Sequence, residues 1–311
     1  LGAAKFLCCV YDLQLQEGMV FAWKIFPAFS PVGPAEYAAL MCLECDDPKV
    51  RAEGLDYFSG ARAYARYPRR GPPARQLLQY IAPHVIKALG DPSAMTRSKA
   101  AGLLRAAGPM DDKFVAQLRE MLKANDAAAN FTGAAALATL KLADEEVVSV
   151  LTKALSARDS SMRQAAINVL EEVGPAAAPA VDGLVRALVG RDASLRTDAA
   201  RALGAIGPGA SAAVPTLSRA VAAGGPLGLC AIRALEQIGP QAVESGMGPI
   251  AAALRGDRDS REAAIKALGT VTPAKADVAM RLIAPHTRDR DENVRKAAEE
   301  ALAKLKILKG G

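Results

Sequence analysis

This sequence of 311 residues is poor in the side chains that most enzymes use for acid–base chemistry and metal binding. It has two histidines, His84 and His286, which lie in opposite parts of the chain, so we do not expect them to share a metal ion or a proton relay. It contains no G-x-S-x-G, phosphate-binding loop, H-E-x-x-H or dinucleotide-binding motif. We therefore expect a protein that is not an enzyme and has no catalytic residues, metal ions or cofactors.

Long apolar runs are also missing. A membrane-spanning helix needs about 18 or more consecutive apolar residues. The most apolar stretch, residues 19–29, is interrupted by Lys24 and Pro27. We expect a soluble protein without a membrane span.

Cysteines are few and odd in number, which excludes the paired framework of a small secreted domain. Four of the five lie before residue 46. Cys42 and Cys45 form a C-x-x-C motif, but no second pair follows at the spacing of a zinc site. These features favour a reducing compartment, either the cytoplasm or an organelle interior. The chain begins with Leu1, which is compatible with removal of a targeting peptide.

Aromatic residues make up 5% of the chain although apolar residues make up 51%, and much of the apolar content is alanine. Alanine favours short, closely packed helices over the cores of β-sheets. The composition predicts an all-α protein.

The dominant feature of the sequence is a repeat of about 33 residues. Alanine or glycine follows the repeated position after three residues, and leucine follows it after seven. Such a period predicts stacked helical units, that is, a solenoid. The repeated position is occupied by Arg97, Asn130, Arg163, Arg196, Gly228, Arg261 and Arg295.

Residues 175–207 represent the unit. Apolar residues at helical spacing occur in both halves, which predicts two antiparallel helices. Gly190 is expected to end the first helix in a left-handed conformation, and Asp192 to cap the second. An acid precedes most of the arginines by four residues, as Asp159 precedes Arg163. We expect these acids and arginines to bond to one another along the stack.

The pattern D-x-x-x-R-x-x-A-x-x-x-L followed by G-P, as in residues 159–175 and 192–208, resembles the short HEAT repeats that are also called phycobilisome-lyase HEAT-like repeats. The resemblance covers about residues 34–305. It implies a right-handed α-solenoid of about eight antiparallel helix pairs over residues 34–311. The family consists mostly of interaction scaffolds, with some chromophore-lyase, DNA-glycosylase and assembly-factor members.

An insertion at residues 59–75 interrupts the repeat. It holds no acid and five arginines, so it accounts for nearly all of the net charge of +6. Arginine and tyrosine together suit carboxylate, phosphate and aromatic partners. We expect this insertion to bind a partner through Arg62, Tyr64, Arg66, Tyr67, Arg69, Arg70 and Arg75. The alternative is a solvated connector.

Two other surfaces are candidates for binding. Five residues after the repeated position stand Arg201, Arg233 and Lys266, which would line one face of successive helices. Twelve of the fourteen aromatic residues precede residue 81. Among them, Trp23 and Phe26 belong to residues 1–33, a segment without the repeat that either caps the array or docks on a partner.

The sequence thus predicts a non-catalytic scaffold or assembly subunit for a protein partner, with an acidic partner surface favoured by the insertion. A nucleic-acid-binding repeat protein and a chromophore-lyase-like protein remain the alternatives. The sequence does not predict the oligomeric state.

Overall fold

The computed structural model describes residues 39, 42–59, 81, 84–106 and 112–310. The chain divides into two compact units, the first ending at Ala143 and the second beginning at Asp144, and each is described by itself. All regular structure in these ranges is helical, so the prediction of an all-α fold is confirmed. The expected boundary between a cap and a solenoid at residue 33 lies outside the described residues.

The first unit is a set of packed helices, in which α4 contacts α7, and α9 contacts both α7 and α8. Leu55, Leu118 and Leu137 form part of its core and are fully buried. In the described part of this unit, the helices with defined bounds are α4 (Pro48–Ser59), α7 (Ala94–Ala106), α8 (Asp112–Leu122) and α9 (Ala127–Thr139). Residues 84–89 are also helical.

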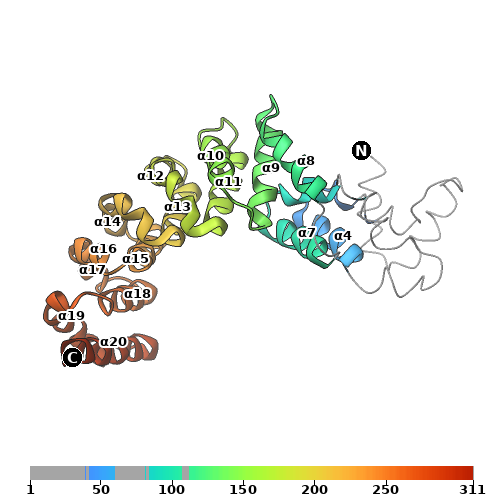
Figure 1. The fold of residues 1–311 in the computed structure, drawn as a ribbon. Coiled ribbons are helices and arrows are strands. Elements are labelled where there is room, and N and C mark those ends of the chain that lie inside the picture. The colour runs from blue at the N-terminus through green and yellow to red at the C-terminus, as the bar shows by residue number, and fades with distance from the viewer. Residues whose placement is uncertain (1–38, 40–41, 60–80, 82–83, 107–111, 311) are drawn as a thin grey trace, which may run out of the picture. The chain divides into compact units, whose positions relative to one another are not determined.

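The second unit is a solenoid of helix pairs (Figure 1). The first helices of the pairs are α10 (Glu145–Ala154), α12 (Val181–Leu188), α14 (Val214–Ala222), α16 (Pro240–Ser245) with α17 (Met247–Ala253), and α19 (Ala276–Ile283). The second helices are α11 (Ser160–Val173), α13 (Ala193–Ile206), α15 (Gly225–Ile238), α18 (Arg258–Leu268) and α20 (Glu292–Gly310). Short 3-10 helices occupy Gly174–Ala180, Gly207–Ala213, Pro273–Lys275 and Ala284–Arg288.

The second helices contact one another in succession, from α11 through α13, α15 and α18 to α20. Figure 1 shows these five along the inner side of the curve of this unit, with the first helices along its outer side. The repeat predicted from the sequence therefore produces two parallel layers of helices. Residues spaced by one period come to lie on adjacent helices of the same layer.

The small and large residues of the repeat form the core between these layers. The alanines three residues after the repeated position are inaccessible to solvent, and so are the leucines seven residues after it in the central helices. Small side chains allow close approach of adjacent helices: a Cβ added to Gly204 of α13 would lie 3.0 Å from the Cα of Ala234 of α15. The fully buried residues include Ala166, Ala199, Ala231, Ala264, Ala298, Leu170, Leu203, Leu235 and Leu268.

The helix ends are closed by the acids and glycines of the repeat. Asp192 accepts hydrogen bonds from the backbone N–H groups of Ser194 (2.9 Å) and Leu195 (3.2 Å), which confirms the expected N-cap. Asp126, Asp159 and Asp257 cap their helices in the same way. The prediction of a left-handed Gly190 is wrong, because Gly190 is not among the residues of positive φ.

The repeated arginine turns back onto the loop that precedes its own helix. Nη1 of Arg163 donates to the carbonyl oxygens of Ala157 (2.8 Å) and Arg158 (2.9 Å), and Arg295 bonds in the same way to the carbonyls six and five residues before it. Asn130 replaces an arginine in this role and donates to the carbonyls of Met121 and Leu122. The arginine therefore closes the turn inside one repeat.

We expected the recurrent arginines to bond along the stack to the acids that stand four residues before an arginine of the series. This prediction is wrong, because those acids accept hydrogen bonds from N–H groups at the start of their own helices. Where a recurrent arginine bonds to the next repeat, it uses a different acid. Arg51 binds Asp91 through Nε (2.6 Å) and Nη2 (3.0 Å), and Arg261 binds Asp289 through the same two nitrogens (2.9 and 3.1 Å). Each of these acids stands six residues before the next arginine of the series.

Loss of a capping acid should weaken the second unit. We expect Asp159→Ala to lower the free energy of unfolding by about 1 kcal/mol, because a backbone N–H at the start of α11 loses its acceptor. Asp159→Ser should retain most of the stability that the cap provides, because serine is also a good N-cap residue. Urea unfolding followed by circular dichroism measures both variants. Glu299→Ala, an exposed change within α20, is the control. Equal midpoints for Asp159→Ala and Glu299→Ala would contradict the assignment of Asp159 as a structural cap.

Candidate partner-binding surface

The inner layer of the second unit carries the row of cations that the repeat predicted. Arg201 lies on α13, Arg233 on α15 and Lys266 on α18, and all three side chains are exposed. Because α15 contacts both α13 and α18, the three residues belong to one continuous surface. Their role in binding a partner remains a prediction.

Acidic side chains occupy the same surface and neutralise part of this row. Arg201 forms ion pairs with Asp198 on its own helix and with Glu171 of α11 (3.3 Å). Lys266 is paired with Glu262 at 2.6 Å. Among the described residues, no carboxylate lies within ion-pair distance of Arg233. The row is therefore a mixed-charge surface and not a basic stripe.

Burial changes the acidity of groups in this row. Burial raises the pKa of Glu171 and of Glu236 above their usual range, against the opposing attraction of nearby cations. Burial likewise raises the pKa of the Cys230 thiol, which lies close to Arg201. A raised pKa leaves this cysteine protonated at neutral pH, so it is not an activated nucleophile.

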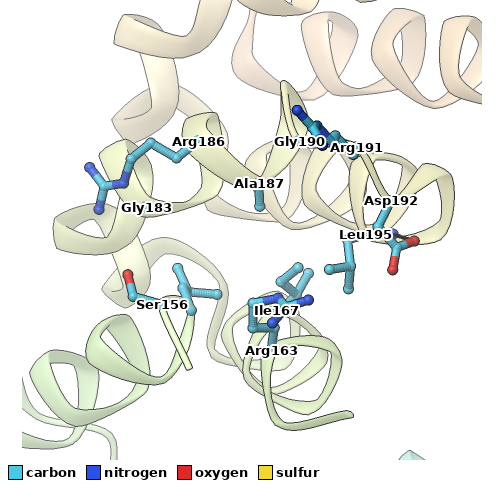
Figure 2. Close-up of a pocket in the computed structure, with 11 residues that line it drawn as sticks. Ser156, Arg163, Ile167, Gly183, Arg186, Ala187, Gly190, Arg191, Asp192 and Leu195 are labelled. Carbon is cyan, nitrogen blue, oxygen red and sulfur yellow. Dashed lines mark hydrogen bonds between the residues drawn. The ribbon is translucent and has the colours of Figure 1, made fainter. Parts of the chain in front are cut away.

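A cavity of about 370 Å³ opens at the turns between the two layers (Figure 2). Arg163 of α11 and Arg186 of α12 line it, together with the turn of Gly190 and Arg191. Its apolar walls include Ile167 and Leu195. The carboxylate of Asp192 also lines it, but that group is already engaged as the N-cap of α13.

The two other groups of predicted binding residues lie outside the described residues. These are the side chains of the insertion (Arg62, Tyr64, Arg66, Tyr67, Arg69, Arg70 and Arg75) and the N-terminal aromatics Trp23 and Phe26. The structure thus brings together Arg201, Arg233 and Lys266, whereas the insertion and the aromatics remain predictions from the sequence.

Both histidines contact acidic side chains. His84 contacts Glu44, and His286 contacts Asp289 at 3.5 Å. Within the described ranges, no three or more His, Cys, Asp or Glu side chains gather in a group that could hold a metal ion. The same ranges contain no helix with the length and apolar character needed to cross a membrane.

The C-x-x-C motif does not form a pair of free thiols. Cys42 is buried and free, with a pKa raised by burial, whereas Cys45 is disulfide-bonded. Cys45 is therefore not available as a second thiolate beside Cys42. The expectation of a reducing compartment draws no support from this motif.

The acids that join the repeats, Asp91 and Asp289, and the cavity beside Arg163 were not predicted from the sequence. A signal for both was present. The signal is the residue six places before the repeated position. It is an acid before Arg97 and Arg295, namely Asp91 and Asp289, but it is Gly190 before Arg196.

Comparisons with known proteins agree with this architecture. Residues 82–171 match the family of HEAT repeats. A search of curated proteins found no match. Among solved structures, an engineered protein is 19% identical over 88% of this chain and 78% of its own length, with a TM-score of 0.50. Importin beta is 13% identical over 87% of this chain, with a TM-score of 0.51. The chain spans 40% of the length of importin beta, and at these identities both likenesses show the fold alone.

The half-buried Glu236 provides a pH test of the inner surface. A folded-state pKa above the unfolded value means that ionisation costs stability, and this cost appears as the pH rises from about 4.3 through the folded-state pKa. We therefore expect Glu236→Gln to be more stable than the unchanged protein at pH 7 and equally stable at low pH. Urea midpoints across this pH range measure the difference, with the exposed change Glu299→Gln as the control. A stabilisation that does not depend on pH would contradict the burial of the Glu236 carboxyl.

Proposed function

The chain is a HEAT-repeat protein, and from this premise we propose that it acts as a non-catalytic scaffold or assembly subunit that binds a protein partner. The observation that carries the proposal is the inner layer of the second unit, where α13, α15 and α18 present exposed polar side chains in register. A surface of this kind grows with the number of repeats and suits an extended partner. A compact substrate would need an enclosed pocket instead.

The insertion supports an acidic partner surface. Five arginines without an acid give residues 59–75 a strong positive charge, while the rest of the chain is nearly neutral. Arginine binds carboxylates through two parallel hydrogen bonds, and tyrosine supplies contact area with little loss of conformational entropy. We propose that the insertion and the cations Arg201, Arg233 and Lys266 contact the partner together.

Nucleic acid is the weaker alternative. Affinity for nucleic acid rises with the number of phosphates that cations neutralise. On the inner surface, however, Glu171, Asp198 and Glu262 already pair with Arg201 and Lys266. A chromophore-handling role is the other alternative, and it predicts a small molecule that remains bound during purification.

An affinity capture from native extract tests the proposal. The intact chain is compared with a variant in which Arg62, Arg66, Arg69, Arg70 and Arg75 are changed to serine. We expect a defined set of proteins that the intact chain retains and the variant loses, because the local positive charge is removed. Quantitative mass spectrometry of the captured proteins measures the difference.

The control removes the same charge elsewhere, by changing Lys153, Arg255, Arg281, Arg288 and Arg290, all exposed, to serine. If this control loses the captured proteins to the same extent, the effect is due to net charge and not to the insertion. Capture abolished by nuclease would replace the protein partner with nucleic acid, and a visible absorption band in the purified chain would favour the chromophore role.

A further inference from the structure

The bonds between repeats show how an arginine of this chain binds a carboxylate. In Arg51 and in Arg261, Nη1 holds loop carbonyls of the arginine's own repeat, while Nε and Nη2 hold a carboxylate of the following repeat. That carboxylate comes from Asp91 or Asp289, and both ion pairs are largely shielded from solvent. A two-point contact of this kind is the strongest that a guanidinium makes with a carboxylate.

Arg163 has the first half of this arrangement and lacks the second. Its Nη1 bonds to the carbonyls of Ala157 and Arg158, as Nη1 of Arg51 and of Arg295 bonds to two loop carbonyls. The residue that should supply the carboxylate, six places before Arg196, is Gly190. Within the described residues no carboxylate forms an ion pair with Arg163. The cavity of about 370 Å³ opens at this place.

The cavity carries an excess of positive charge. Arg163, Arg186 and Arg191 line it, and its one carboxylate, that of Asp192, accepts hydrogen bonds from the backbone of α13 and from Ser160 (3.4 Å). In the described part of the chain, neither Arg186 nor Arg191 forms an ion pair. Figure 2 shows Arg163 below the turn of Gly190 and Arg191 in this view. In the sequence of the repeat, Gly190 holds the place that Asp91 and Asp289 occupy in two other repeats.

The neighbouring arginine shows that a missing acid alone does not make a site. Arg196 also lacks the acid of the next repeat, because Ala222 stands there. Its Nε is buried without a hydrogen-bond partner and is therefore closed to an incoming group. Arg163 differs because it borders an open cavity.

We propose that the cavity at Arg163 binds a carboxylate side chain, aspartate or glutamate, of the protein partner. The incoming carboxylate occupies Nε and Nη2 of Arg163 and replaces the acid that Asp91 and Asp289 supply elsewhere. The carboxylate of Asp192 at the rim disfavours a dianion such as phosphate. This inference rests on the proposed function, since it names the chemical group that the partner inserts.

The test uses the full chain and a fluorescein-labelled hexaglutamate peptide, with hexaglutamine as the uncharged comparison, in fluorescence anisotropy at low ionic strength. We expect Arg163→Gln to weaken hexaglutamate binding by at least about tenfold, because a charge-assisted two-point contact is lost. Arg158→Gln removes an exposed charge of the neighbouring turn that does not line the cavity, and should leave the affinity within about twofold.

Gly190 allows a sharper comparison. Gly190→Asp restores the missing acid within the chain, so it should block the peptide and raise the urea midpoint. Gly190→Asn has nearly the same shape without the charge and should do neither. An added Cβ lies 3.1 Å from the carbonyl oxygen of Ala187, a crowding that both variants share. Circular dichroism verifies that each variant is folded. If Arg163→Gln does not fold, the comparison of Gly190→Asp with Gly190→Asn tests the proposal instead.

Several results would overturn the inference: no binding of hexaglutamate, equal binding by Gly190→Asp and Gly190→Asn, or an unchanged affinity in Arg163→Gln. Free glutarate that binds as tightly as the peptide would assign the cavity to a small molecule instead. If only the five-serine variant of the insertion loses the peptide, the cavity is not used and the proposed function stands. If partner capture fails while Gly190→Asp still blocks hexaglutamate, the cavity stands and the proposed function falls.

Discussion

At two places, Arg51 and Arg261, the arrangement of successive repeats depends on a guanidinium that is shared between two turns. A helix end leaves backbone carbonyls without partners, and Nη1 of Arg51 satisfies two of them in its own repeat. The other edge of the guanidinium then faces the next repeat. Asp91 shows the result most clearly, because its carboxylate binds Arg51 while its carbonyl oxygen accepts from Nη1 of Arg97. One residue thus fixes the turn of its own repeat and the distance to the preceding one.

Much of the fold could be predicted because it is encoded locally. The spacing of Ala199 and Leu203 defines the buried side of a helix, and Asp192 caps that helix through atoms only two and three residues away. The partners of the arginines are not encoded locally. Acids recur both four and six residues before the arginine, and the backbone of the turn decides their roles. The nearer one, in extended conformation, turns toward its own helix, and the farther one reaches the preceding repeat.

The candidate surface was predicted in position but not in charge. Counting a single place in the repeat found Arg201, Arg233 and Lys266 and gave the impression of a basic stripe. The acids that accompany them occupy other places in the repeat, and they come alongside only when adjacent helices stack, as Glu171 does beside Arg201. Neither composition nor a motif pointed to the cavity, and its one signal was the glycine at position 190, where the repeat elsewhere places Asp91 and Asp289. Repetition positions a surface well, whereas the chemistry of that surface depends on residues that depart from the repeat.

Departures from the repeat differ in their consequences. Some change the structure without creating a binding site, and others leave a group that can bind a partner. At Gly228 the arginine is missing, and the place of its acid in the next repeat is taken by Arg255. The backbone closes instead, so that a Cβ on Gly228 would lie 3.0 Å from the carbonyl oxygen of Val221. At Gly190 only the acid is missing, which leaves Arg163 with half of its hydrogen bonds at an open cavity. A partly buried guanidinium without a carboxylate costs stability. An external carboxylate would relieve that cost, and this is the physical reason to expect a partner at this turn of the solenoid.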